Sequence, residues 1–222
     1  MNLKPEHKQY ILEHENEIRE NNWEEFFKPG EYPFSIGEPL YLANIPFMEY
    51  LKYVPEYAFY NCENLTSVTI PSGVTYIGNY AFGSCTGLTS ITIPEGVTSI
   101  GERAFSYCTG LTSITIPESV TVIDFAAFHH CSGLTSVTLA EGVTSIGSLA
   151  FFSCKNLTSV VIPNSVTSIG KDAFACIPTD LIITYGGTKE QWKQIYDKET
   201  FRYVYFTVNC IDGKIVKKRP KK

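Results

Sequence analysis

The chain has 222 residues, of which 44% are hydrophobic and 18% are charged, and its formal net charge is −5. This composition is that of a globular protein with enough apolar residues for a continuous core. Residues 214–222 hold six basic residues and no acidic one, whereas the rest of the chain carries 12 basic and 23 acidic residues. An acidic body argues against nucleic-acid binding, because phosphate contacts need clustered Lys and Arg.

The N-terminal segment predicts neither a secretory signal nor a membrane anchor. Its first twenty residues are polar and acidic, with no apolar run and no small-residue cleavage site. No other stretch approaches the roughly 20 apolar residues of a membrane span. As the sequence stands, a cytoplasmic location is slightly favoured, and a surface or secreted location would require that a leader has been removed.

Residues 1–50 are expected to form an N-terminal helical and aromatic cap. Residues 5–20 predict an amphipathic helix, because Ile11, His14 and Ile18 share one face. A second short helix is expected to start near Asn22. The nine aromatic residues of segment 32–60 are interpreted as a plug over the first repeat, with an aromatic binding patch as the alternative.

Residues 51–183 contain a repeat with a period of 23 residues. Within one period, an Ala-Phe pair is followed by Cys, by Leu, by an alternating segment such as Leu88–Pro94, and by an apolar pair such as Val97 and Ile100. The Ala-Phe pairs begin at Ala58, Ala81, Ala104, Ala127, Ala150 and Ala173. Six copies in one phase predict a solenoid of about six turns.

The composition of each copy predicts how the turns stack. A single copy cannot enclose its own apolar face, so stacked copies place equivalent residues above one another at the strand spacing of about 4.8 Å. Alternation predicts strands of a parallel sheet, which the following Pro ends. Glycines such as Gly78, Gly101, Gly147 and Gly170 are expected in turns, where a positive φ would suit them.

The repeat resembles the BspA-like (Treponema-type) leucine-rich repeat family. The stretch from Cys85 to Phe105 matches the family frame Cys-x-x-Leu-x-x-Ile-x-Ile-Pro-x-x-Val-x-x-Ile-Gly-x-x-Ala-Phe without a mismatch. This resemblance implies a leucine-rich-repeat solenoid that is rich in β-strand and built on a parallel sheet. It also implies protein binding, because members are often bacterial surface adhesins or host-interaction proteins, although others lack export signals.

Residues 184–222 are expected to form a C-terminal cap of helix and strand, followed by a basic tail. Thr188 and Gln191 form a predicted capping box, which Trp192 follows at helical spacing. Residues 201–208 alternate like a strand, and residues 215–222 are interpreted as a solvated tail. The segment resembles the cap that often closes BspA-like arrays.

The sequence predicts no enzyme, no cofactor and no metal site. The Cys column is interpreted as a buried, reduced ladder, with disulfides between neighbouring turns as the alternative. His129 and His130 form the one His-rich spot, but further ligands are not predicted near them, so a surface loop is favoured over a metal site. No Ser, His and acid are predicted to meet in one place.

Two sets of exposed positions are candidate binding residues for a partner protein. The outward strand positions form hydroxyl columns: Ser90, Thr92, Ser113, Thr115, Ser136 and Thr138. The variable turn positions carry aromatic residues and Arg, which are typical interface anchors: Tyr80, Arg103, Tyr107, His130 and Phe152. The alternative for this second set is that the side chains fold back onto the solenoid edge.

The predicted function is therefore a non-catalytic protein–protein interaction module, for example an intracellular binder or inhibitor. The first alternative is a cell-surface adhesin or host-interaction protein. The alternative from another class is binding of a carbohydrate or an ice surface through the Ser and Thr columns.

Overall fold

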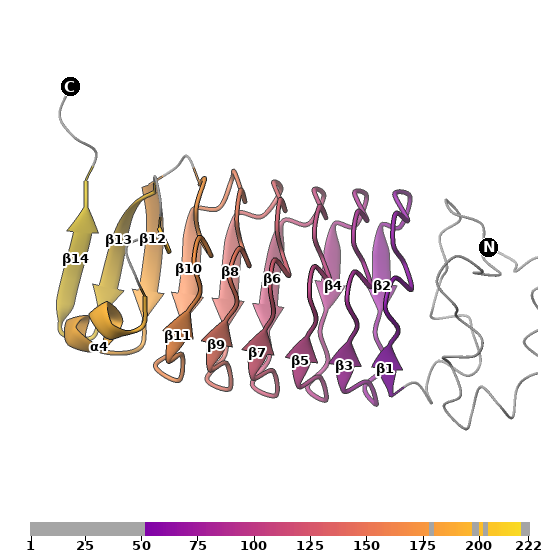
Figure 1. Cartoon of the computed structure of the whole chain (residues 1–222), viewed down its shortest axis with the longest axis horizontal. Coiled ribbons are helices and arrows are strands. Elements are labelled where there is room, and N and C mark those ends of the chain that lie inside the picture. Colours follow the sequence, from indigo (N-terminus) through magenta and orange to yellow (C-terminus); the bar gives the residue numbers. More distant parts are fainter. Residues whose placement is uncertain (1–51, 178–179, 197–199, 202–203, 219–222) are drawn as a thin grey trace, which may run out of the picture.

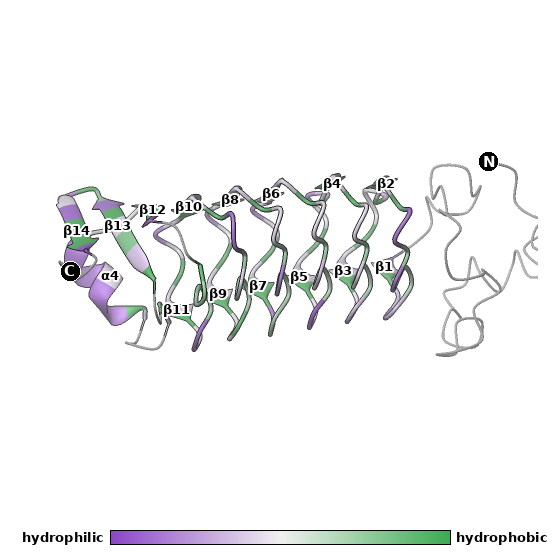
Figure 2. Ribbon diagram, turned by 90° about the horizontal axis from the view of Figure 1, so that it is seen from above, coloured by the Kyte–Doolittle hydropathy of each residue, from purple (hydrophilic) through white to green (hydrophobic). Residues whose placement is uncertain are grey.

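The computed structural model describes residues 52–177, 180–196, 200–201 and 204–218. The helices predicted within residues 1–50 lie outside this part, as does the aromatic segment 32–60 up to residue 51. The described chain is a solenoid in which each turn contributes one strand to each of two sides (Figure 1). Seen from above, the turns follow one another along one axis, so that equivalent positions of neighbouring turns lie side by side (Figure 2).

One side of the solenoid is a continuous parallel sheet of two-residue strands. Its order is β1-β3-β5-β7-β9-β11. The strands are β1 (Tyr53–Val54), β3 (Tyr76–Ile77), β5 (Ser99–Ile100), β7 (Val122–Ile123), β9 (Ser145–Ile146) and β11 (Ser168–Ile169).

The other side carries the alternating segments and is divided into two sheets. The first sheet pairs β2 (Ser67–Thr69) with β4 (Ser90–Thr92). The second has the order β6-β8-β10-β12-β13-β14 when read from the repeats to the C-terminus. Its strands are β6 (Ser113–Ile116), β8 (Ser136–Leu139), β10 (Ser159–Ile162), β12 (Asp180–Tyr185), β13 (Tyr205–Cys210) and β14 (Gly213–Lys217).

The core consists of ladders of equivalent residues, as the period predicts. In the Phe ladder the rings of Phe82 and Phe105 stack with centroids 5.1 Å apart and planes 6° apart. The ladder continues into the C-terminal segment, where Phe174 stacks on Phe201 at 5.4 Å. The Ala, Leu, Val and Ile columns beside it are buried in the same way. Each turn therefore completes the core of its neighbours, and no turn has a separate one.

The Cys ladder is buried and reduced, which confirms the prediction. All seven cysteines are free, and Cys85, Cys108, Cys131 and Cys154 are buried, whereas Cys176 is exposed. Each ladder thiol donates to a Phe carbonyl oxygen of the preceding turn, as Cys131 Sγ does to the oxygen of Phe105 at 3.0 Å. Burial raises the pKa of the Cys154 thiol to about 12 and that of Cys131 well above its usual value, so both stay protonated.

The expectation of a positive φ at the repeat glycines is wrong. Among the described glycines, Gly213 has the one positive φ, and the left-handed residues of each turn are the one before the Ala and the third after it. In the column of Gly78 and Gly147, which holds Asp124 in one turn, the glycines pack closely against the preceding turn. A Cβ on Gly147 would lie 2.6 Å from the carbonyl carbon of Asp124.

The predicted capping box is present at the helix α4 (Lys189–Gln194). The Thr188 hydroxyl accepts from the Gln191 amide, and the Gln191 side chain accepts from the Thr188 amide. Trp192 is fully buried and packs against Tyr185 and Phe201. The helix thereby lies over the end of the core.

Two expectations for the C-terminal segment need correction. The strand expected over residues 201–208 begins at Tyr205, since Phe201 instead extends the Phe ladder. Residues 215–217, interpreted as a solvated tail, belong to β14, which pairs antiparallel with β13 from Cys210–Gly213 to Phe206–Lys217. The reason is the tight turn at Ile211-Asp212, which joins the paired residues Cys210 and Gly213, and Gly213 has a φ of 128°.

Candidate binding surfaces

Four of the five variable turn residues lie in two columns whose backbone is left-handed. Tyr80 and Arg103 precede the Ala of their turns and have φ values of 53° and 50°, and Tyr107 and His130 follow it with values of 61° and 59°. This conformation is uncommon for residues with a side chain, and its recurrence comes from the turn that each copy makes at this edge. Phe152 occupies the column next to that of His130.

Aromatic rings and one guanidinium pack together at the N-terminal half of this edge. The rings of Tyr57 and Tyr80 stack at 4.9 Å, and Tyr60 meets both edge-on. Arg103 donates to the Tyr80 hydroxyl at 2.8 Å and lies 4.8 Å from the centroid of the Phe125 ring. The guanidinium also forms an ion pair with Glu102. The cluster is therefore held by stacking, cation–π and charge-assisted contacts at once.

A second cluster continues along the same edge. Tyr107 stacks on His130 with centroids 4.8 Å apart, and His129 stacks on Phe152 at 5.3 Å. Burial, with smaller contributions from the nearby positive charges of His130 and Arg103, lowers the pKa of His129 to about 4. His129 Nδ1 is buried without a hydrogen-bond partner. Arg103 of the first cluster and Tyr107 of the second belong to the same turn, so the two clusters are neighbours.

We call these side chains together the aromatic ridge: Tyr57, Tyr60, Tyr80, Arg103, Tyr107, His129, His130 and Phe152. The structure brings all five predicted edge residues into it and adds Tyr57, Tyr60 and His129. Those three occupy the same columns in the sequence, so their column membership was the signal that could have identified them. Ring faces are used in contacts between turns, but Tyr60 and Tyr107 remain 45% and 46% exposed.

The predicted hydroxyl columns lie on the outer face of the divided side. Ser90, Thr92, Ser113, Thr115 and Thr138 are exposed and Ser136 is half-buried, whereas the residues between them point into the core. Ser113 pairs in register with Ser136, and Thr115 with Thr138. The Thr column ends after Thr138, because Val161 takes the next position.

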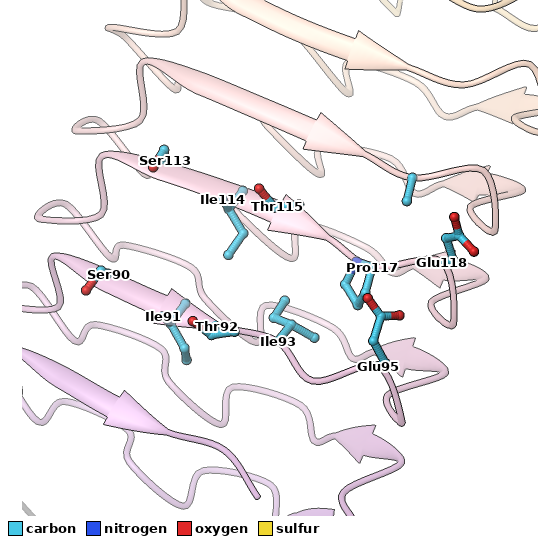
Figure 3. A pocket seen from close by; sticks show the side chains of 11 residues that line it. Ser90, Ile91, Thr92, Ile93, Glu95, Ser113, Ile114, Thr115, Pro117 and Glu118 are labelled. Atoms are coloured by element: carbon cyan, nitrogen blue, oxygen red, sulfur yellow. The ribbon is translucent and has the colours of Figure 1, made fainter. Parts of the chain in front are cut away.

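A cleft separates two neighbouring turns on this side. β2 pairs with β4 and β6 pairs with β8, but β4 and β6 fall in different sheets. The resulting cleft has a volume of about 730 Å³ (Figure 3). Its lining includes Ser90, Thr92, Ser113 and Thr115, so four of the predicted hydroxyl residues are brought together here.

We searched the described part of the chain for a membrane-spanning helix and for a metal-binding cluster of side chains. Its helices include none that is long and apolar enough to cross a membrane. No three His, Cys, Asp or Glu side chains of described residues are grouped so that they could hold a metal ion.

The stacked turns, the two rows of strands and the 23-residue period define a leucine-rich-repeat solenoid, and comparison with known families specifies its type. Residues 52–179 match the BspA type leucine rich repeat region in six copies. The chain therefore belongs to the BspA-type leucine-rich-repeat family.

Solved structures of leucine-rich repeat proteins are similar to this chain. A leucine-rich repeat protein of T. pallidum is 30% identical over 67% of this chain and 73% of that one, with a TM-score of 0.49. A leucine-rich repeat protein of Bacteroides ovatus is 30% identical over 65% of this chain, with a TM-score of 0.53, and the match spans 45% of that longer protein. Comparison with curated protein sequences finds no match.

Proposed function

We propose that this protein is a non-catalytic binding module that contacts a partner protein through the aromatic ridge. The solenoid of residues 51–183 would be the binding body, and residues 1–50 and 184–222 would cap it. The observation that carries the proposal is the ridge itself. At columns where other turns hold Gly, Ser or Ala, this chain places Tyr, His and Phe next to Arg103. Tyr, Trp and Arg are the residues that most often anchor protein interfaces.

Binding a partner costs conformational entropy, because side chains at the interface become ordered. A flexible aromatic or Arg side chain loses rotamer freedom when a partner covers it. In the ridge these side chains are already held by stacking and by the bond from Arg103 to Tyr80 at 2.8 Å. The ridge therefore offers exposed aromatic edges at a low further cost in entropy.

The test compares three immobilised proteins: the natural chain, a ridge variant and a matched control. The ridge variant carries Tyr80→Gly, Arg103→Gly, Tyr107→Gly, His130→Gly and Phe152→Ser. Gly suits the four left-handed positions, and Ser occurs in the Phe152 column at Ser106. The control carries Ser84→Gly and Ser153→Gly, which lie in the Tyr107 column with φ values of 60° and 59°.

Captured proteins are quantified by mass spectrometry from lysate of the native cells and, separately, from the medium or host cells. We expect a stoichiometric protein that the natural chain and the control capture and the ridge variant loses. Equal capture by all three would overturn the proposal. Capture from lysate supports an intracellular binder or inhibitor, and capture from outside supports the adhesin or host-interaction alternative.

The hydroxyl columns support a second candidate, binding of a carbohydrate or an ice surface. The observation that favours it is the in-register pairing of Ser113 with Ser136 and of Thr115 with Thr138, which repeats hydroxyls once per turn. The array is short, since the cleft borders it on one side and Val161 on the other. Thermal hysteresis or glycan binding that Thr115→Val and Thr138→Val abolish would establish this candidate.

A further inference from the structure

We infer that the cleft between β4 and β6 receives a Lys or Arg side chain from an extended segment of the partner protein. The inference rests on the proposed protein-binding function but on a different surface of the molecule. It assigns the aliphatic part of that side chain to an isoleucine wall, and its charged group to Glu95 and Glu118.

The cleft exists because hydrogen bonding between turns is interrupted at one place. The Thr89 hydroxyl donates to the carbonyl oxygen of Thr66 at 3.2 Å, and the Thr135 hydroxyl donates to that of Thr112 at 3.1 Å. In the part of the chain that the structure describes, no bond joins Thr112 to Thr89. On the other side the same two turns remain paired through β5 and β7. Peptide groups at the facing edges of β4 and β6 are thus left for a ligand.

The wall of the cleft is apolar. The inward column of this side reads Val68, Ile91, Ile114, Val137 and Val160, so the cleft lies where two isoleucines follow each other. Ile114 is 3% exposed, whereas Ile91 is half-buried and Ile93 completes the wall. An unbranched alkyl chain placed here would cover the apolar surface that Ile91 leaves open.

The end of the cleft is acidic. Glu95 and Glu118 follow the two strands, and Figure 3 shows their carboxylates at the end where β4 and β6 stop. Both residues are exposed, and no Lys or Arg lines the cleft. Two carboxylates beyond an apolar wall favour a ligand that ends in a cation.

Lys and Arg side chains combine these two properties. They bury an alkyl stem along apolar surface while the charged end group reaches a polar partner. An acidic side chain would be repelled at the end of the cleft, and a neutral aliphatic one would lack the carboxylate contacts. Hydroxyls of Ser90, Thr92, Ser113 and Thr115 beside the cleft can bond the backbone of the segment that carries the basic residue.

The probes are three capped pentapeptides in which Lys, norleucine or Glu lies between pairs of glycines. Norleucine has an alkyl stem like that of Lys but no charge, so it isolates the contribution of the carboxylates. Each probe is titrated into the uniformly nitrogen-15-labelled full chain, and amide shifts are followed by NMR. We expect the Lys peptide to shift the amides of residues 90–95 and 113–118, and to bind at least about tenfold more tightly than the norleucine peptide.

Glu95, Glu118 and Glu141 occupy the same position of successive turns, so their Gln variants provide a test and its matched control. Glu95→Gln with Glu118→Gln should lower the affinity for the Lys peptide to that for the norleucine peptide. Glu141→Gln should leave it unchanged, because Glu141 occupies the same column in the next turn and does not itself line the cleft, although Ala140 beside it does. Equal affinities for Lys and norleucine peptides, equal effects of all Glu variants, or shifts elsewhere on the chain would overturn the inference. The ridge variant should still bind the Lys peptide, so failure of the ridge proposal and failure of the cleft proposal are distinguishable.

Discussion

Tyr107 and His130 occupy the same position of neighbouring turns, and their rings stack with centroids 4.8 Å apart although both residues have a left-handed backbone. A left-handed residue with a side chain costs about 1–3 kcal/mol, and a stacked pair contributes about 0.5–1.5 kcal/mol. The stacking and the backbone cost therefore oppose each other at these two positions.

The first prediction concerns the balance between ring stacking and backbone strain at Tyr107. Tyr107→Gly should change the free energy of unfolding by no more than about 1 kcal/mol, because relief of the backbone offsets the lost ring contact. Tyr107→Ala should be less stable than Tyr107→Gly by about 1 kcal/mol, since Ala loses the ring without that relief. Urea denaturation measures both values. If Ala and Gly were equally destabilising, the left-handed backbone at this position would be refuted.

The second prediction concerns His129 and acid. Its pKa is about 4 in the folded chain because burial disfavours the charged imidazolium, against a usual value of 6.5. Between these values the unfolded chain binds the proton more readily, so the contribution of His129 is fully present above pH 6.5 and is lost as the pH falls towards 4. The side chain thus makes the fold more sensitive to mild acid.

His129→Phe should remove this pH-dependent contribution to the free energy of unfolding. Phe fits here, since Phe152 occupies the same column in the next turn. Urea denaturation at about pH 7.5 and about pH 4.5 should show a smaller loss of stability for the variant than for the natural chain. An equal loss in both proteins would mean that His129 titrates in the folded chain as it does in water.

The third prediction concerns thiol reactivity. Cys176 is exposed and should be alkylated first in the native protein. Cys108 and Cys131 should be protected until the chain unfolds, because burial both covers the thiols and raises their pKa values. Mass spectrometry of peptides after brief iodoacetamide treatment, with and without urea, gives the order. Native labelling of Cys131 at the rate of Cys176 would contradict the buried ladder.

The fourth prediction separates two kinds of Gly. Gly147→Ala should destabilise the fold by about 1–3 kcal/mol, because the added methyl would lie 2.6 Å from the carbonyl carbon of Asp124 in the preceding turn. Gly83→Ala is the control, since its methyl would meet the movable ring of Tyr60 at 2.9 Å. Thermal unfolding should show a larger drop in Tm for Gly147→Ala. The reverse order would contradict the close approach of the turns.

Much of the fold was predictable because the period alone dictates which residues meet. A spacing of 23 residues places Phe82 beside Phe105 and Cys108 beside Cys131, whatever the backbone does between them. The capping box at Thr188 was predictable for a local reason, since its two hydrogen bonds join residues three positions apart. The hairpin of β13 and β14 is equally local, since its turn at Ile211-Asp212 joins the paired residues Cys210 and Gly213.

The aromatic ridge was predictable in part. Column membership identified Tyr80, Arg103, Tyr107, His130 and Phe152 as edge residues, because the repeat frame leaves those positions variable. Which rings stack on which depended on the tertiary structure. Stacking needs the left-handed turn to set the direction of each side chain, and the sequence pattern does not specify that direction.

Sequence by itself determined the solenoid, its ladders and the columns that face the solvent, because these follow from the period and from the alternation of apolar residues. The tertiary structure alone decided the cleft between β4 and β6. The two turns that flank it share the segment Leu-Thr-Ser-Ile-Thr-Ile-Pro at 88–94 and 111–117, so neither copy carries a local signal for a break. Whether two such strands pair depends on how the side chains of one turn, including Ile91 and Ile114, fit against those of the next, and that fit exists only once the turns are stacked.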